Sequence, residues 1–204
     1  MLMFVLVVAA VVIVIVAAVL VIGFGQRRGR RLKKRFGPEY EHVVLRHKGD
    51  TNAAEAELGD RVRRHGALKE RSLSAEAREG YAAQWVDIQA QFIDSPSTAV
   101  ADADALLSRL AEDRGFPPGS HYDDQVAALS VHHSDHVRGY RDLHTTARSQ
   151  GTTQEMREAM IRARGLFIAM TAEQPAPSRR PHLDHRDPQH RGPGRHHRKG
   201  STTS

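Results

Sequence analysis

The chain has 204 residues, no cysteine and a net charge of +6 at pH 7, with a pI near 10. The lack of cysteine excludes disulfides, a thiol nucleophile and any zinc site that uses sulfur. Residues 27–35 carry +7 and residues 171–204 carry +4, which leaves −5 for residues 36–170. Because a mildly acidic central region repels phosphate, nucleic acid is an unlikely partner for it despite the high pI.

The first 24 residues contain no charged side chain and consist mostly of Val, Ile, Leu and Ala. A helix of that length reaches about 36 Å, more than the hydrocarbon thickness of a bilayer, about 30 Å. We therefore predict a transmembrane helix over residues 1–26, with the lipid bilayer as its partner. A cleaved secretory signal is the alternative, although such signals have a charged start and a shorter apolar stretch. Ala10 and Ala17 lie seven residues apart, so two spans could pair as a homodimer.

A cluster of cations follows the apolar stretch and comprises Arg27, Arg28, Arg30, Arg31, Lys33, Lys34 and Arg35. Cations beside a span stay on the cytoplasmic side. We therefore expect a single-pass protein of the plasma membrane, with its N-terminus outside and the residues after the span in the cytoplasm. Cleavage as a signal would instead export the chain. The cluster could also bind anionic lipid head groups, but a role in topology alone is the simpler interpretation.

Residues 27–71 are predicted to form a basic juxtamembrane segment followed by charged linker helices. Pro38 suits the first position of one short helix. Asp50 or Thr51 could cap a second helix that runs to about Arg64. The apolar stripe of the second helix is narrow, so we expect it to connect the membrane to the next domain or to pack on one side only.

Residues 72–170 are predicted to form a small antiparallel helical bundle, because apolar residues recur at helical spacing and never alternate as in a sheet. Ser74 suits the N-cap of the first helix, and Ser95 with Pro96 suits the start of the second. Gly115 suits the end of that second helix. The main core contributors are expected to be Trp85, Phe92, Leu107, Leu110, Tyr140 and Phe167. We interpret Trp85 as a core anchor; stacking on a ligand is the functional alternative.

Two further helices complete the predicted bundle. Asp135 could cap the first of them, and Thr152 with Glu155 has the spacing of a capping box for the second. Residues 171–204 are rich in His, Arg and Pro and are predicted to be a disordered tail. That tail could bind divalent metal weakly or act as a pH-dependent basic arm, although a solvated tail without function is the simpler reading.

Within the predicted bundle, the candidate metal ligands are three histidines, namely His132, His133 and His136. Pairs three or four residues apart can present two imidazoles on one helix. The candidates are weak because Asp135 between them resembles a helix cap and no third ligand is fixed by spacing. His144 lies on an apolar face and is interpreted as a partly buried, hydrogen-bonded histidine. We predict no cofactor and no enzyme activity, since no nucleophile elbow, phosphate-binding loop or paired-histidine metalloprotease motif occurs.

A set of short motifs spread over residues 1–170 carries a family resemblance. The motifs are LKKRFGPEY at 32–40, AAEAEL at 53–58, Leu73-Ser74 with Tyr81 and Trp85, QAQFID at 89–94, LSV at 129–131, and Tyr140-Arg141 with His144. As a set they resemble a family of actinobacterial proteins, labelled hypothetical or secreted, that have one N-terminal span, a basic stop and a small helical domain. The resemblance implies that architecture and brings with it no activity, ligand or catalytic residue.

These observations predict an all-α, membrane-anchored protein. The leading functional hypothesis is a non-enzymatic protein-interaction module at the cytoplasmic face, with a protein partner that the sequence does not identify. The alternative is a binder of anionic lipid or polyanions through residues 27–35 and the basic tail. An enzyme or a metal protein built on the histidine cluster is the third hypothesis.

Overall fold

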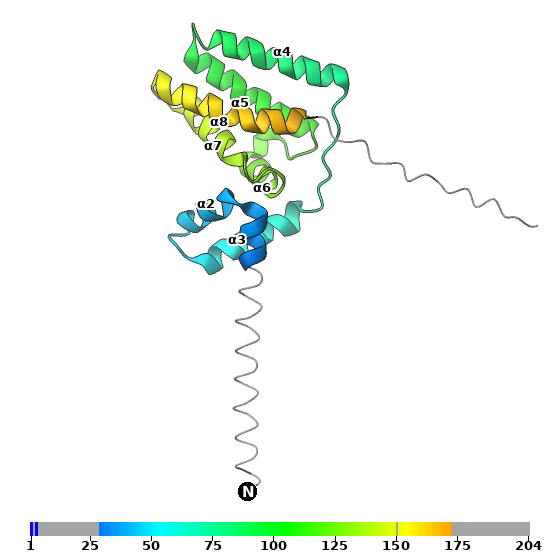
Figure 1. Cartoon of the computed structure of the whole chain (residues 1–204), viewed down its shortest axis with the longest axis vertical. Helices are drawn as coiled ribbons and strands as arrows, with labels where there is room; N and C mark the ends of the chain where they lie inside the picture. Colours follow the sequence, from blue (N-terminus) through cyan, green and yellow to red (C-terminus); the bar gives the residue numbers. More distant parts are fainter. Residues whose placement is uncertain (2, 4–28, 150, 173–204) are drawn as a thin grey trace, which may run out of the picture. The chain divides into compact units, whose positions relative to one another are not determined.

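The computed structural model describes residues 1, 3, 29–149 and 151–172, and every regular element among them is a helix (Figure 1). The elements are α2 (Pro38–Arg46), α3 (Thr51–His65), α4 (Ala75–Gln91), α5 (Pro96–Asp113), the 3₁₀ helix η1 (Gly119–His121), α6 (Tyr122–His132), α7 (Val137–Arg148) and α8 (Thr153–Thr171). Residues 29–36 are also helical and precede α2. The all-helical prediction is therefore confirmed for this part of the chain.

Two predicted segments fall almost entirely outside the described residues: the membrane span at 1–26 and the tail at 171–204. The helices that are described include none with the length and apolar character needed to cross a bilayer. Arg27 and Arg28 of the basic cluster also lie outside the described part.

Polar side chains begin three of the helices as their sequences predict. The Asp50 carboxylate accepts hydrogen bonds from the first backbone N–H groups of α3, and the Ser74 hydroxyl accepts one from the first turn of α4. Thr152 and Glu155 form the complete capping box at the start of α8. Such caps satisfy backbone donors that the helix itself leaves unpaired. The boundaries of these helices are thus set locally.

Two predicted caps differ from the structure. Ser95 occupies the N-cap position of α5 but its hydroxyl makes no capping bond. The prediction that Asp135 caps α7 is wrong, because His136 is the N-cap residue there and contributes no side-chain bond. The His133 carbonyl accepts the backbone N–H groups of both His136 and Val137. This continuous turn from α6 into α7 removes the need for a side-chain cap.

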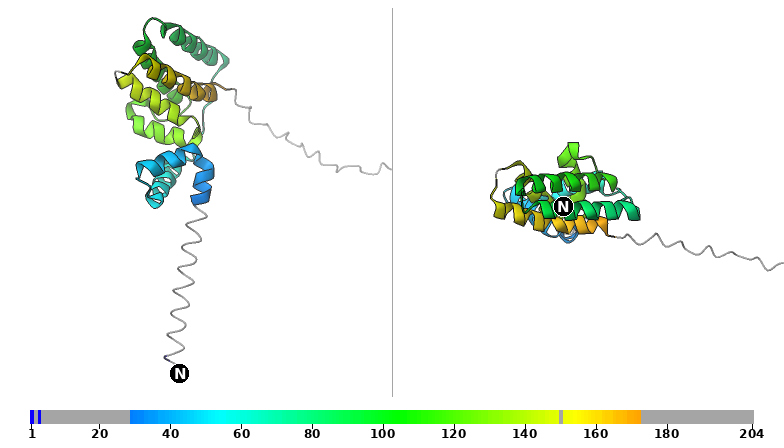
Figure 2. Two further views of the ribbon diagram at one scale, coloured as in Figure 1. Left: turned by 60° about the vertical axis from the view of Figure 1, so that its left-hand side comes forward. Right: turned by 90° about the horizontal axis from the view of Figure 1, so that it is seen from above.

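The main core is built around α5, whose seven buried apolar residues meet α4, α7 and α8. Trp85 is buried and its ring stacks on Phe167 of α8, with the ring centroids 4.6 Å apart. Leu107, Leu110 and Tyr140 are buried as predicted, whereas Phe92 is only partly buried at the edge. Figure 2 shows α4 and α8 as neighbouring outer helices of this bundle.

A second, smaller core joins residues 29–62 to the bundle. It is formed by Leu32, Phe36, Tyr40, Val43, Ala54 and Leu58 together with Val131 of α6. The helix α3 packs directly on α6. Its narrow apolar stripe, which indicated one-sided packing, is therefore buried between α2 and α6.

Candidate functional site

Most of the large exposed apolar side chains belong to two helices of the bundle. Five large hydrophobic residues are exposed within residues 29–149 and 151–172, namely Leu45, Val86, Ile93, Ile161 and Ile168. All but Leu45 lie on α4, just after it or on α8. Single exposed hydrophobic residues are normal on a protein surface, but a cluster of them marks an interaction site. We call the surface where α4 meets α8, formed by Gln89, Phe92, Arg157, Met160, Ile161 and Arg164, the α4–α8 face.

A groove of about 180 Å³ lies in this face and is lined by Gln89, Phe92, Arg157, Met160, Ile161 and Arg164. The Arg157 guanidinium lies over the Phe92 ring, 5.8 Å from its centroid. Pockets for small-molecule ligands usually measure about 300–1,000 Å³. The groove is smaller than that, so its size suits one apolar side chain of another protein better than a metabolite.

The two arginines of the groove have no acidic partner among the described residues. Arg157 donates a hydrogen bond to the side-chain oxygen of Gln154, and Arg164 makes no ion pair. By contrast, Arg162 on the neighbouring face of α8 pairs with Asp142, with Nε and Oδ2 2.9 Å apart. The groove therefore combines apolar side chains with two arginines that could form ion pairs with carboxylates of a partner.

The sequence of each helix explains why this face stays open. On α4, the stripe of Tyr81, Trp85 and Ile88 is buried, and the opposite side carries Val86 and three exposed alanines, Ala82, Ala83 and Ala90. Helix α4 therefore carries apolar side chains on two sides, and the core buries only one of them. Only the buried stripe was predicted from the sequence; the helical spacing of Val86 and Ile93 was the signal for the second one.

The basic cluster, where it is described, forms a one-sided helix. Leu32 and Phe36 point into the smaller core. The opposite side exposes Arg30, Arg31, Lys33, Lys34 and Arg35. Lys33 makes a solvent-exposed ion pair with Glu41, with Nζ and Oε1 2.7 Å apart. These five cations are defined here as the basic face.

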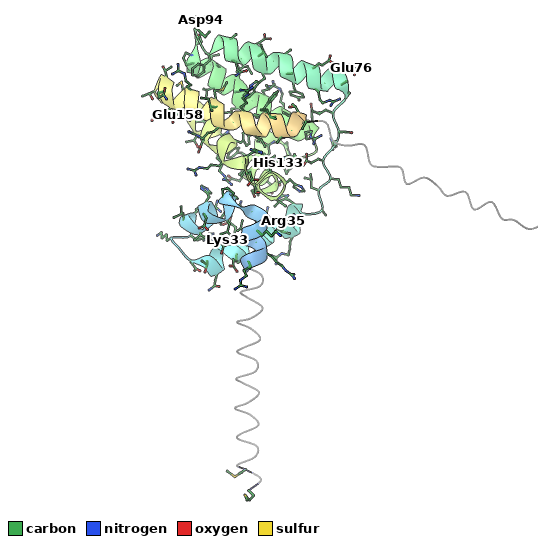
Figure 3. The ribbon with its side chains drawn as sticks, in the orientation of Figure 1. Lys33, Arg35, Glu76, Asp94, His133 and Glu158 are labelled. Atoms are coloured by element: carbon green, nitrogen blue, oxygen red, sulfur yellow. The ribbon has the colours of Figure 1, made fainter. Side chains whose placement is uncertain are left out.

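The three candidate metal-binding histidines contact different partners. The His132 ring nitrogen Nε2 lies 2.9 Å from the His65 carbonyl oxygen, and Nε2 of His133 lies 3.2 Å from the Glu70 carboxylate. His136 occupies the N-cap position of α7. Within the described residues, no group of three or more His, Asp or Glu side chains is arranged to hold a metal ion. His133, whose place in the bundle is labelled in Figure 3, is instead part of a cluster with Glu70 and the buried Arg114.

His144 is partly buried and hydrogen-bonded, as its sequence position indicated. Its Nδ1 lies 2.9 Å from an Asp104 carboxylate oxygen, and its ring stacks on Tyr122 with centroids 3.6 Å apart. The stacking covers one face of the imidazole. We assign this pair to the packing of α7 against α5 and the start of α6.

A buried ionic network, which sequence reasoning missed, joins the smaller core to the bundle. The Glu39 carboxylate is buried and accepts two hydrogen bonds from Arg141 of α7 and one, 2.8 Å long, from Arg61 of α3. Arg61 Nη1 also donates to the Ser130 hydroxyl at 2.9 Å. Burial alone would raise the pKa of Glu39, but the hydrogen bonds and charges of the two arginines hold it below its ordinary value.

Comparison of this chain with protein-family models, with curated proteins and with solved structures finds no match.

Proposed function

We propose that this chain is a non-enzymatic, membrane-anchored interaction module that binds a protein partner through the α4–α8 face. The observation that carries the proposal is a groove between α4 and α8 lined by the exposed Ile161, the partly buried Phe92, and two arginines without an acidic partner among the described residues. Hydrophobic anchors with arginine at the edge are typical of protein–protein interfaces. The anchor belongs to the proposal because residues 1–24 are apolar and are followed by cations.

Site-specific photo-crosslinking of the full chain in intact cells tests this proposal. A photoreactive residue at Ile161 should give a defined protein adduct, identified by mass spectrometry. The same residue at Leu45, which is 77% exposed against 66% for Ile161, is the matched control. The adduct at Ile161 should disappear when Arg157 and Arg164 are both replaced by Glu. Equal adducts at both positions, or none at Ile161, would contradict the proposal.

A second candidate function is the binding of anionic lipid head groups through the basic face. Its support is the geometry of residues 29–36, which bury Leu32 and Phe36 and expose five cations on the other side. Each cation near a bilayer surface contributes about 1 kcal/mol of attraction to anionic lipid. The full chain in vesicles of mixed phosphatidylserine and phosphatidylcholine should therefore retain phosphatidylserine preferentially.

That preference should fall when Arg30, Arg31, Lys34 and Arg35 are replaced by Gln, and it should weaken as salt is added. Replacement of Lys69, an exposed loop lysine that is not part of the basic face, should leave the preference unchanged. Equal lipid retention by the two variants would exclude this second function.

A further inference from the structure

A hollow of about 330 Å³ lies between the helix of residues 29–36, α2 and α3, and it is lined by Gly29, Arg30, Lys33, Tyr40 and Glu55. Its volume falls within the range of small-ligand sites, about 300–1,000 Å³. It shares no residue with the groove of the α4–α8 face. Two of its lining side chains are cations and one is a carboxylate, so the hollow presents both signs of charge.

Glu55 brings to this hollow a carboxylate that no side-chain cation neutralises. It is half-buried on α3, and its Oε1 accepts a hydrogen bond from the Tyr40 hydroxyl, 3.0 Å long. Within the described residues no Lys, Arg or His forms an ion pair with it, although Arg30 and Lys33 line the same hollow. The second carboxylate oxygen, Oε2, is therefore open to a charged N–H donor of a ligand.

Gly29 makes room for this carboxylate. The glycine is buried, and a Cβ placed on it would lie 2.3 Å from Glu55 Oε1 and 3.0 Å from the carboxyl carbon. Both are atoms at the flexible end of a side chain, so a larger residue at this position would push the carboxylate aside and leave the backbone in place. Glycine thus keeps the Glu55 carboxylate at the wall of the hollow.

The two cations of the hollow can receive an anion. Arg30 is exposed and has no ion pair or hydrogen bond within the described part of the chain. Lys33 lies over the Tyr40 ring, 5.8 Å from its centroid, and its ion pair with Glu41 is exposed to solvent. Such a pair contributes at most about 1 kcal/mol, so Lys33 can exchange Glu41 for a more strongly bound anion. A guanidinium and an ammonium three residues apart on one helix lie on the same side and suit a phosphate.

We propose that this hollow binds the zwitterionic head group of phosphatidylethanolamine, with its phosphate on Arg30 and Lys33 and its ammonium on Glu55. The inference rests on the membrane anchor of the proposed function. Gly29 follows Phe24, the last residue of the apolar stretch, by five positions. At no more than about 3.6 Å per residue these positions cover at most about 18 Å, so the hollow stays within reach of the lipid head groups.

The carboxylate of Glu55 selects the primary ammonium among common head groups. Choline carries a positive charge but has no N–H group to donate, and glycerol carries no positive charge. The serine head group adds a carboxylate, which Glu55 repels. This selectivity differs from that of the basic face, whose cations favour the lipid with the greater net negative charge.

Lipid retention by the full chain tests the site. The chain is placed in vesicles of equal parts phosphatidylethanolamine and phosphatidylcholine and extracted in mild detergent, and the retained lipids are counted by mass spectrometry. We expect phosphatidylethanolamine to exceed phosphatidylcholine about tenfold, which corresponds to about 1.4 kcal/mol. Glu55→Gln should bring the ratio to about one, whereas Glu79→Gln, a change of an exposed glutamate on α4, should preserve it. A ratio of one for the natural chain, or no change in Glu55→Gln, would overturn the proposal.

Two further variants separate the ammonium contact from the phosphate contact. Gly29→Ala should also lower the ratio, because its Cβ displaces the carboxylate, and it decides the question if Glu55→Gln loses its helical circular dichroism. Arg30→Gln should lower the amounts of both lipids and leave their ratio unchanged, since both carry phosphate. A changed ratio with undiminished total lipid in Arg30→Gln contradicts the assignment of the phosphate.

Flotation of the same vesicles on a density gradient distinguishes failure of this site from failure of the anchor. A chain that floats but shows no preference for phosphatidylethanolamine retains the anchor and lacks the site. A chain that does not float lacks the anchor, and both proposals then fail. Binding of soluble phosphoethanolamine in equilibrium dialysis, without enrichment of the lipid, would assign the hollow to a soluble zwitterion and refute the lipid. The protein adduct at Ile161 in cells depends on none of these results.

Discussion

Glu39 lies between two arginines that come from different helices, α3 and α7. Its carboxylate is buried, as is Arg61, so the three groups form a desolvated network. Removing one partner of such a network costs more than the network contributes, because it leaves charge buried without compensation. The residue therefore links the smaller core to the bundle through electrostatics.

We predict that Glu39→Gln lowers the free energy of unfolding by about 3 kcal/mol, since the neutral amide removes the buried countercharge of Arg141 and leaves Arg61 with Glu57 alone. Urea unfolding of the full chain in micelles, followed by the fluorescence of the single Trp85, measures this. Glu41→Gln on the same helix is the control, because its exposed pair with Lys33 contributes at most about 1 kcal/mol. Similar losses in the two variants would show that the network is not stabilising.

At the scale of elements, the backbones of α7 and α8 approach each other closely at Gly139. A Cβ placed there would lie 2.4 Å from the Arg162 carbonyl oxygen and 2.6 Å from its carbon. Both are backbone atoms of α8, so a larger residue requires the helices to separate. Glycine is thus needed for this contact, which aligns α8 and its exposed stripe.

We predict that Gly139→Ala destabilises the chain by about 2 kcal/mol through overpacking of the two helices. Gly80→Ala in α4 is the matched control, because a Cβ there meets nothing within 4 Å. That substitution should stabilise the helix by up to about 1 kcal/mol, since alanine is the better helix former. Thermal unfolding followed by circular dichroism should therefore show shifts of opposite sign. Shifts of the same sign would refute this account of the contact.

The capping box offers a second test at this scale. Thr152→Ala should lower stability by about 1 kcal/mol, because the side chain that accepts the Glu155 backbone N–H is lost. Thr153→Ala, one position further along, removes an exposed hydroxyl that makes no capping bond and should change little. Comparing the urea unfolding midpoints of the two variants separates the loss of the capping hydrogen bond from the effect of replacing any threonine by alanine. Equal midpoints would mean that α8 begins without help from its cap.

At the scale of the whole molecule, two carboxylates couple stability to pH. Burial alone would raise the pKa of Glu57, but hydrogen bonds from His47, Arg46 and Arg61 lower it to about 2. Burial likewise opposes ionisation of Glu70, and the hydrogen bonds and charges of His133 and Arg114 lower its pKa to about 2. The ordinary pKa of both groups is 4.5. Folding therefore favours their charged forms.

We predict that the stability these groups supply is fully present above pH 4.5 and is lost as pH falls toward 2. The sign follows because a depressed pKa in the folded state means that the unfolded chain binds protons first. Urea midpoints measured across this range should decline, and Glu70→Gln should reduce the steepness of the decline. A midpoint independent of pH between those limits would show that the two ion clusters do not contribute.

Local sequence signals predicted much of the bundle but only part of the candidate site. Ser74, Asp50 and the Thr152–Glu155 pair began helices as expected, since a cap acts on the three residues that follow it. Trp85 was predicted as a core residue from its stripe. Asp135 does not cap α7, because the His133 carbonyl already accepts the first backbone N–H group of that helix.

The amino-acid sequence by itself determined the helices, three of their caps and the stripes that face α5, because hydrogen bonding and amphipathic spacing act within one helix. Only the tertiary structure decided that Glu39 and Arg61 are buried together, although both look like residues of a solvated face. It also decided which apolar side of α4 is covered and which is left open with α8. The reason is that burial depends on residues distant in sequence. The periodicity of one helix does not reveal which other helices pack against it.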